Sequence, residues 1–503
     1  MRKIPTTMAT QHPDNSSIPF WHDREFISTQ DEVREIYENF STLGVDEYMW
    51  DWEGKYADEA IFEKLFAQYL EYFKKHQVGR DEFITLRIPN IWEEKTFKLP
   101  RAYISVLSAA EFVTSLGLHC PPVLEFILPM TKSADQLIHI QETFEQTSKL
   151  HEKIFSHQAR SYALDYIQII PLFESIDDLA GCGEILEEYL KLHQKKFKKN
   201  PPYLRVFIAR SDPALNAGFV PAVLASRMAV REIWRVSKKT GVPMYPIIGT
   251  GTLPFRGGAN PTRVEAFLAQ NPGIKTYTIQ SAFRYDFELG VVKKALKKIA
   301  KVGAEPVAVE FSDADFKGLK KINEILRKPY CATIEAAAKF VNEMAAQVPK
   351  RRERMQHTGL FGYNRGVGKT KLPRAITFTA AWYSAGIPPE LIGVGRGLQE
   401  VEKAGLMPLL LKHFPLIWED LHEAGRFVNW ENLAILSEKH AWAKDVFDEI
   451  RYLDENYDVK AWPSTDEELI HRNLTSTLML KKRAGMDFSY ELLEAAKIRK
   501  SLG

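Results

Sequence analysis

Strand-like apolar runs recur through the first two-thirds of the chain at intervals of about 30 to 45 residues, which is room for one strand and one crossover helix. The runs are GVDEYMWDW near 44, FITLRIPN near 83, VLEFILPM near 123, YIQIIPLFE near 166, YLRVFIARSD near 203, PMYPIIGTG near 243 and TYTIQSAFR near 276. A further candidate strand is EPVAVEFSD near 305. The rhythm predicts a repeated unit of one β-strand and one α-helix.

The segments between the strands carry helical signals. SRMAVREIWRVSKKTG and VVKKALKKIAKVG each end in basic residues and then break at a glycine, which suits the helix dipole and a glycine C-cap. Near-continuous apolar strands covered by helices indicate a parallel sheet that is buried on both faces. The number of repeats favours a closed (β/α)8 TIM-type barrel of the α/β class over an open sheet.

The pattern becomes mostly helical after about residue 320. Examples are EAAAKFVNEMAAQVPKRRERM and LPRAITFTAAWYSAG. We therefore expect additional α-helices, mostly in the C-terminal third, packed onto the barrel. No linker or low-complexity segment divides the sequence, so residues 1–503 are predicted to form a single domain.

Charge and cysteine content exclude several classes of protein. Lys and Arg total 67 against 65 for Asp and Glu, so no overall field attracts nucleic acid or an anionic membrane surface. Three cysteines without CxxC spacing indicate neither a disulfide framework nor a zinc site. The N-terminus lacks the apolar segment of a signal peptide, and no long apolar run predicts a membrane span. We expect a cytoplasmic protein.

Polar residues at the carboxyl ends of barrel strands line a shared mouth, where barrel enzymes have their active sites. The candidates here are Glu174, Asp212, Arg87, Arg256, Gln280 and Arg284. Two carboxylates on consecutive strands, without Cys or His, suit a hard cation such as Mg²⁺ or Mn²⁺. Arginines around such a cation indicate an anionic substrate, a phosphate or a carboxylate held by bidentate hydrogen bonds.

Each candidate also has a purely structural interpretation. Glu174 or Asp212 alone could be a helix N-cap or part of a surface ion pair. Arg87 could be a salt-bridged arginine, and Arg284 could pair with Asp286 nearby in the chain. The FRGG segment that contains Arg256 could be no more than a turn.

Two further motifs stay open at this level. His12, in TMATQHPDN, could act as a general base, or it could be structural or merely exposed near the chain start. RGVGKT, residues 365–370, has the wrong glycine spacing for a nucleotide-binding P-loop and does not follow a strand. It is either a mobile basic loop that closes over an anion or a plain surface loop.

Taken together, these segments resemble phosphoenolpyruvate carboxylase, in the short archaeal type that also occurs in some bacteria, over nearly the whole chain. IPTTMATQHPDN is similar to the N-terminal signature of that family, and PLFESIDDL to a metal-binding segment of its longer members. RVFIARSDPALNAG resembles the second metal motif. The remaining matches are LRIPN, GTGTLPFRGGANP, TIQSAF and LPRAITFTAAWYSAG.

The resemblance implies a role for each matched residue. It implies metal ligation by Glu174 and Asp212, with Mg²⁺ or Mn²⁺ as the cofactor. It also implies a catalytic role for His12. Arg87 and Arg256 are likewise implied to be catalytic residues, which hold the anionic groups, while Gln280, Arg365 and Arg374 are implied to bind the substrate.

The chain departs from the longer enzymes at three places. Their glycine-arginine loop has two arginines, but Thr250 stands where the first would be, leaving Arg256. The lysine after their Ser-Asp motif is missing in SDPALNAG. IRKSLG, at the C-terminus, has no evident counterpart of their asparagine near the feedback-inhibitor site, so inhibition by aspartate or malate is not implied.

The reaction implied by the resemblance is carboxylation of phosphoenolpyruvate with bicarbonate, which gives oxaloacetate and phosphate through carboxyphosphate and an enolate. The resemblance also implies a homotetramer. One alternative is another metal-dependent barrel enzyme of phosphoenolpyruvate or pyruvate, a lyase or a phosphotransferase, which would need no bicarbonate. A second alternative is a non-catalytic anion-binding protein that retains the fold.

Overall fold

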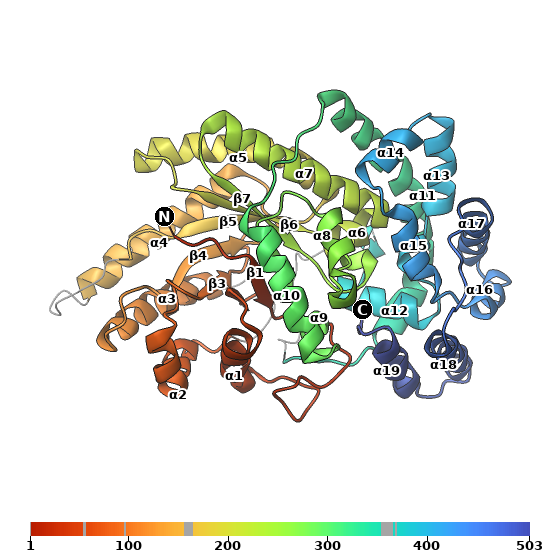
Figure 1. The fold of residues 1–503 in the computed structure, drawn as a ribbon, viewed down its shortest axis with the longest axis horizontal. Helices are drawn as coiled ribbons and strands as arrows, with labels where there is room; N and C mark the ends of the chain where they lie inside the picture. Colours follow the sequence, from red (N-terminus) through yellow and green to blue (C-terminus); the bar gives the residue numbers. More distant parts are fainter. Residues whose placement is uncertain (1, 54–56, 95–96, 155–163, 354–365, 368–369) are drawn as a thin grey trace.

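Eight parallel strands form a closed barrel in the computed structural model, which describes residues 2–53, 57–94, 97–154, 164–353, 366–367 and 370–503 (Figure 1). The strands are β1 (Thr7–Thr10), β2 (Glu47–Asp51), β3 (Phe83–Arg87), β4 (Val123–Leu128), β5 (Gln168–Phe173), β6 (Leu204–Ala209), β7 (Met244–Gly249) and β8 (Thr276–Ile279). Each strand pairs with the next in sequence, and β8 pairs with β1. The predicted (β/α)8 barrel is confirmed.

Helices follow the strands and cover the outside of the barrel (Figure 1). They are α1 (Glu32–Glu38), α2 (Ile61–Lys75), α3 (Lys98–Ser115), α4 (Ala134–Ile154), α5 (Ile176–Phe197), α6 (Ser211–Ala217), α7 (Phe219–Thr240), α8 (Val264–Gln270), α9 (Ser281–Tyr285) and α10 (Leu289–Ala304). Short helical turns are η1 (Thr29–Asp31), η2 (Asn39–Leu43), η3 (Pro254–Arg256), η4 (Pro261–Arg263) and η5 (Pro389–Leu391).

The predicted additional helices form a second half of the molecule beside the barrel (Figure 1). They are α11 (Asp313–Ala345), α12 (Ala375–Ser384), α13 (Val394–Lys403), α14 (Met407–His413), α15 (Ile417–Gly425), α16 (Trp430–Ser437), α17 (Ala441–Tyr457), α18 (Asp466–Arg483) and α19 (Ser489–Ile498). One buried apolar cluster joins this half to the barrel, because it contains Val220 and Leu224 of α7 as well as Leu326 of α11.

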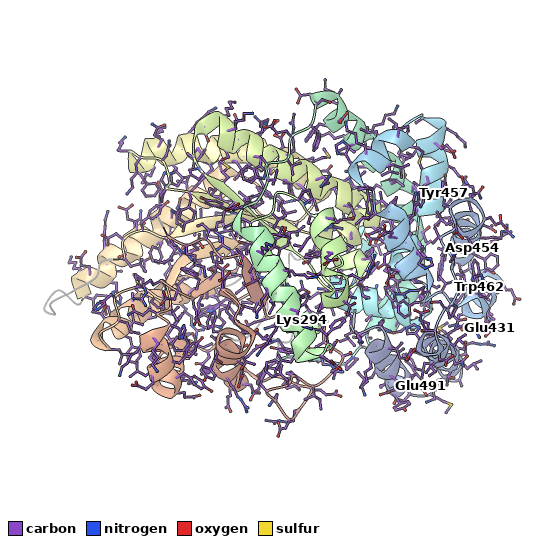
Figure 2. The ribbon with its side chains drawn as sticks, viewed as in Figure 1. Lys294, Glu431, Asp454, Tyr457, Trp462 and Glu491 are labelled. Atoms are coloured by element: carbon purple, nitrogen blue, oxygen red, sulfur yellow. The ribbon has the colours of Figure 1, made fainter. Side chains whose placement is uncertain are left out.

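Aromatic side chains lie at the outer edge of the helical half. Figure 2 shows Tyr457 and Trp462 there, far from the barrel strands. The Tyr457 ring stacks on Trp418 with centroids 4.4 Å apart, whereas Trp462 is 53% exposed.

Within the described residues, no helix has the length and apolar character needed to cross a membrane.

The identity of the eighth strand differs from the prediction. The barrel is closed by Thr7–Thr10, which is fully buried, and not by EPVAVEFSD near 305. Residues 306–312 form an irregular connection between α10 and α11, and Val307 is 75% exposed. Val309 and Phe311 are partly buried against the large apolar clusters without forming a strand, so the prediction of a strand for this segment was wrong.

The two glycines that were predicted to end helices behave differently in the structure. α7 ends at Thr240, and Gly241 takes the left-handed C-cap conformation with φ +72°, as predicted. α10 instead continues through Gly303 and ends at Ala304. A Cβ at Gly303 would lie 2.7 Å from the carbonyl oxygen of Lys275, so this glycine allows the helix to approach the chain just before β8 closely and does not end the helix.

The barrel interior changes from charged to apolar along its axis. Near the amino ends of the strands, Arg205 is fully buried and binds Glu47 at 2.6 Å and Glu125 at 2.7 Å. Burial pushes the pKa of Glu125 up, but Arg2 and Arg205 outweigh this and hold it below its ordinary value. The middle is filled by an apolar cluster of Met8, Met49, Ile127, Ile170, Leu172, Phe207, Ala209 and Ile247. The polar mouth lies beyond this cluster.

Replacing Arg205 by Met should strongly destabilise the fold, because Glu47 would stay buried without its cation and Glu125 would keep only Arg2. Breaking a buried pair from one side typically costs about 3–5 kcal/mol. Chemical denaturation followed by circular dichroism should show a lower midpoint for the variant. Lys403→Met, which removes the exposed Lys403–Glu400 pair, is the control and should leave the midpoint unchanged. Equal midpoints for both variants would contradict this reading of the barrel interior.

Candidate active site at the barrel mouth

The strand-end residues that the sequence singled out lie at one end of the barrel, because the carboxyl ends of all eight parallel strands meet there. His12 lies just beyond β1, Arg87 ends β3, Glu174 follows β5, Asp212 lies in the first turn of α6 after β6, and Gln280 follows β8. Arg256 reaches the same place from the loop after β7. The topology thus brings these six residues to one mouth.

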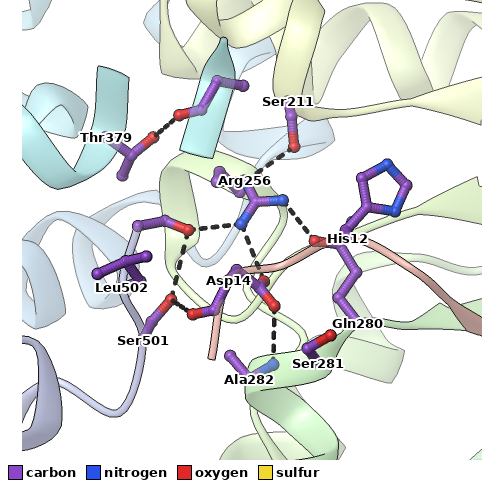
Figure 3. A network of polar contacts seen from close by, with 12 residues as sticks. His12, Asp14, Ser211, Arg256, Gln280, Ser281, Ala282, Thr379, Ser501 and Leu502 are labelled. Carbon is purple, nitrogen blue, oxygen red and sulfur yellow. Dashed lines mark hydrogen bonds and ion pairs between the residues drawn. The ribbon is translucent and has the colours of Figure 1, made fainter. Parts of the chain in front are cut away.

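Arg256 is the centre of a buried polar network (Figure 3). Its guanidinium pairs with Asp14 at 2.9 Å and donates to the Ser211 hydroxyl at 3.2 Å. It also donates to the Gln280 side-chain oxygen, and to the backbone oxygen of Gly503 at 2.5 Å. One arginine therefore joins the ends of β1, β6 and β8 to the C-terminal tail.

Burial governs the charge states in this network. Arg256 is 1% exposed and Asp14 is fully buried. Burial raises the pKa of the Asp14 carboxyl and lowers the pKa of Arg256, while the direct ion pair opposes both shifts. Asp14 also accepts a hydrogen bond from the backbone N–H of Ala282 at 2.7 Å, so the carboxylate is held on both oxygens.

Glycines explain how the loop can carry this arginine. Gly257 and Gly258 have φ of +116° and +72°, which an L side chain rarely adopts. A Cβ on Gly251 would lie 2.8 Å from the guanidinium carbon of Arg256, so a side chain at 251 would displace the guanidinium from its place over the loop. The FRGG segment is a turn, and it also buries a cation at the mouth.

His12 follows a strand of the barrel and does not belong to a loose chain end. Its Nδ1 lies 2.9 Å from the hydroxyl of Thr10. Its backbone oxygen accepts a hydrogen bond from the N–H of Asp14 at 3.1 Å. The ring lies beside Gln280 and the Arg256 network (Figure 3). The structure thus brings His12 to the same mouth as Arg256.

Arg87 is already paired with carboxylates. Its guanidinium binds Asp51 through two hydrogen bonds of 2.9 and 2.7 Å and approaches Glu53 at 3.0 Å. Burial, together with the charges of Glu53 and Asp51, raises the pKa of nearby Glu94 to about 8. Arg87 is therefore salt-bridged at the mouth, and its assignment to a substrate anion stays a prediction.

Glu174 and Asp212 fit a hard divalent cation in their donor chemistry. They follow β5 and β6, which are hydrogen-bonded neighbours in the barrel, and both offer carboxylate oxygens. Among the described residues, no group of three or more His, Cys, Asp or Glu side chains could hold a metal ion. Two protein carboxylates would leave the other coordination positions to water and substrate oxygens, as Mg²⁺ prefers.

The structure says less about Arg374 and Arg365, the other residues that were predicted to bind the substrate. Arg374 is the half-buried N-cap residue of α12. Arg365 lies outside the described residues, as does part of the RGVGKT segment. The described part of that segment belongs to an antiparallel pair, β9 (Gly366–Val367) and β10 (Thr370–Lys371). Neither interpretation of this loop is tested.

Sequence reasoning missed the contacts that hold the site together. Arg284 does not use Asp286 as its partner; it donates to the Thr10 carbonyl and to Asn39, both at 2.6 Å. Asp286 instead accepts hydrogen bonds from the backbone N–H groups of Ser16 and Ser17, both at 2.7 Å. Asp14 could have been suspected from its position in QHPDN.

The C-terminal tail is the other missed element, and no local pattern announces it. The Leu502 N–H donates to the Asp14 carbonyl at 2.7 Å. Gly503 packs on α12 so closely that a Cβ would lie 2.1 Å from the Ile376 carbonyl oxygen. Only glycine therefore fits at 503 while its backbone oxygen accepts from Arg256.

Comparison with known proteins shows to which family this chain belongs. A family model described as phosphoenolpyruvate carboxylase matches residues 4–503. A protein of that name from Leuconostoc mesenteroides is 39% identical over 508 residues, covering 100% of this chain and 99% of the relative. The namesake from Metallosphaera sedula is 36% identical, covering 100% of both chains. The resemblance inferred from the motifs is confirmed, and the chain belongs to the phosphoenolpyruvate carboxylase family.

Proposed function

We propose that this protein carboxylates phosphoenolpyruvate with bicarbonate, forming oxaloacetate and phosphate at the barrel mouth. The observation that carries the proposal is the buried Arg256 network, which places a cation between His12 and the tail in a chain that matches the family from end to end. A substrate with a phosphoryl group and a carboxylate needs cationic partners at fixed positions, and the arginines that meet at this mouth support the proposal.

The first step transfers the phosphoryl group. A bicarbonate oxygen forms a bond to phosphorus, and the bond between phosphorus and the bridging oxygen of phosphoenolpyruvate breaks, which gives carboxyphosphate and the enolate of pyruvate. Arg256 and Arg374 hold phosphoryl oxygens, and Arg87 offsets charge on the transferring group, while Gln280 orients Arg256. Glu174 and Asp212 would hold Mg²⁺ or Mn²⁺, which supplies Lewis-acid charge near the substrate oxygens when bound.

The second step uses His12 as a base. His12 takes the proton of carboxyphosphate, the carbon–oxygen bond to phosphate breaks, and CO₂ is released beside the enolate. The methylene carbon of the enolate then attacks CO₂ and forms oxaloacetate. Neutral imidazole is a competent base near neutral pH.

Assembly and location belong to the same proposal. We infer a homotetramer and a cytoplasmic enzyme. Large apolar side chains are exposed on and around the last helices, among them Ile470 and Leu480 of α18 and Tyr490 of α19, as expected where subunits meet. Size-exclusion chromatography with light scattering should give four times the chain mass.

The direct assay couples oxaloacetate to NADH oxidation through malate dehydrogenase, with phosphoenolpyruvate and Mg²⁺, with and without bicarbonate. Bicarbonate-dependent oxidation is expected. Pyruvate or phosphate formation that does not depend on bicarbonate, with no oxaloacetate, would instead favour another lyase or phosphotransferase of the barrel class. No turnover by folded protein with either Mg²⁺ or Mn²⁺ would favour a binding protein.

His12→Asn should uncouple the two steps, because the phosphoryl group can still move while no base takes the carboxyphosphate proton. Oxaloacetate formation should fall by roughly 10²–10⁴-fold. Phosphate release should fall less, and pyruvate should become the main organic product. Separate measurement of phosphate, pyruvate and oxaloacetate tests this. An unchanged ratio of oxaloacetate to phosphate would remove His12 from the mechanism.

A further inference from the structure

The hydroxyl of Thr10 is a hydrogen-bond partner of the His12 ring. Thr10 ends β1 and is fully buried, and its Oγ1 lies 2.9 Å from Nδ1 of His12. Within the described residues the Thr10 hydroxyl has no other hydrogen-bond partner. This hydroxyl can donate to Nδ1 or accept from it, so the direction of the hydrogen bond is coupled to the tautomer of His12.

The position of Thr10 is fixed from several sides. Its backbone is paired with Met49 of β2, and β1 lies between β2 and β8. Its carbonyl accepts a hydrogen bond of 2.6 Å from Arg284, which is fully buried and also bound to Asn39. A β-branched side chain on a buried strand has few rotamers. The Thr10 hydroxyl is therefore a rigid reference point for the imidazole.

The direction of this hydrogen bond is linked to which ring nitrogen of His12 carries the proton. A neutral imidazole has one N–H and one lone pair, and the hydrogen bond at one nitrogen selects the tautomer. If Nδ1–H donates to the Thr10 oxygen, Nε2 keeps a lone pair and can accept a proton. If the hydroxyl donates to Nδ1, the proton lies on Nε2 and the ring cannot act as a base there.

We propose that Thr10 is a positioning residue for His12, accepting its Nδ1–H so that Nε2 is the base for the carboxyphosphate proton. This inference rests on the proposed function. In the step, the O–H bond of carboxyphosphate breaks and the proton goes to Nε2. The O–H electron pair forms the second C=O bond of CO₂. The bond between that carbon and the oxygen that bridges it to phosphorus breaks, and its electron pair stays on the phosphate oxygen. Thr10 then stabilises the imidazolium through the same Nδ1–H.

The first test reads the tautomer directly. Two-bond ¹H–¹⁵N spectra of the full-length protein with ¹⁵N-labelled histidine should show the Nδ1–H tautomer for His12, assigned by its loss in His12→Asn. The proposal expects a protonated Nδ1 and an unprotonated Nε2. A proton on Nε2 in the neutral ring would overturn the proposal, whatever any variant does in an assay.

The second test uses a matched pair of variants. Thr10→Val keeps the shape and removes the hydroxyl, whereas Thr10→Ser keeps the hydroxyl. Oxaloacetate formation should fall about 10- to 100-fold in Thr10→Val, because part of the contribution of the base is lost. Phosphate release should fall less, so the pyruvate share rises, and the pH profile of oxaloacetate formation should shift. Thr10→Ser should stay within about twofold of the parent, because it keeps the hydroxyl that orients the base.

The outcomes separate this inference from the proposed function. If the parent forms oxaloacetate but Thr10→Val keeps the parental product ratio and pH profile, the role of Thr10 is wrong and the function stands. If Thr10→Val and Thr10→Ser lose activity equally, Thr10 acts only through the fold of β1, and the proposal also fails. If the parent forms no oxaloacetate, the proposed function fails, and the tautomer spectrum still decides the Thr10 contact.

Discussion

Arg256→Met should reduce kcat/KM for oxaloacetate formation by at least about 10²–10³-fold, the usual effect of removing one preorganised group that stabilises transition-state charge. Arg256 is the cation that joins three strand ends to the tail, and no other side chain in the described mouth replaces its contacts with Asp14 and Gln280. The same change should also destabilise the protein, because Asp14 would remain buried without its cation.

A second variant separates catalysis from stability. In the double variant Arg256→Met with Asp14→Asn, no uncompensated charge is buried, and the amide oxygen of the introduced asparagine can still accept the Ala282 N–H. We expect the double variant to recover most of the thermal stability and none of the activity. Arg263→Met is the control, since Arg263 lies in the next turn and its acidic neighbours are 3.7 Å or more away. Near-parental activity in the double variant would contradict the role of Arg256.

Glu174→Gln and Asp212→Asn should each nearly abolish turnover. Loss of a metal-bound charge raises the free energy of the transition state by several kcal/mol. The turnover rate should therefore fall roughly 10²–10⁴-fold. Each variant should also bind Mn²⁺ more weakly in the absence of substrate, measured by electron paramagnetic resonance of the free ion. The binding measurement distinguishes a lost metal site from a general loss of activity.

The control for these variants makes the same chemical change on an exposed carboxylate. Asp177→Asn lies in the first turn of α5, where the side chain is 79% exposed and reaches Arg327 at 3.3 Å. It should keep parental activity and Mn²⁺ affinity. Unaltered Mn²⁺ binding in Glu174→Gln and Asp212→Asn would show that these carboxylates are not the metal ligands, whatever the activities are.

Most of the barrel could be predicted because its strands are continuous apolar runs. β2 to β8 are largely buried on both faces, and that burial is what the runs encode. β1 is different, since TMAT is short and half polar, and its side chains are buried only because the barrel closes around it. EPVAVEFSD has the composition of a strand, but it lies outside the barrel as an irregular connection that is only partly buried, and composition cannot distinguish these two positions.

The site was predictable where chain topology alone places a residue. Glu174 and Gln280 follow strands directly, so a barrel brings them to one mouth. The partner of Arg256 in the tail could not be found this way, because Gly503 is 247 residues further along the chain and its contact depends on how the C-terminal helices pack. The structural alternative for Arg284, a pair with Asp286, was wrong for a related reason, since the partners of Arg284 come from β1 and η2 rather than from its near neighbour in the chain.

The central claim is that this barrel mouth transfers the phosphoryl group of phosphoenolpyruvate to bicarbonate. The most direct measurement is turnover with ¹⁸O-labelled bicarbonate, followed by mass spectrometry of the phosphate. Because the attacking oxygen stays on phosphorus when carboxyphosphate breaks down, each phosphate formed should carry one labelled oxygen, and oxaloacetate should carry label in its new carboxylate. Unlabelled phosphate, formed together with oxaloacetate or pyruvate, would contradict the account.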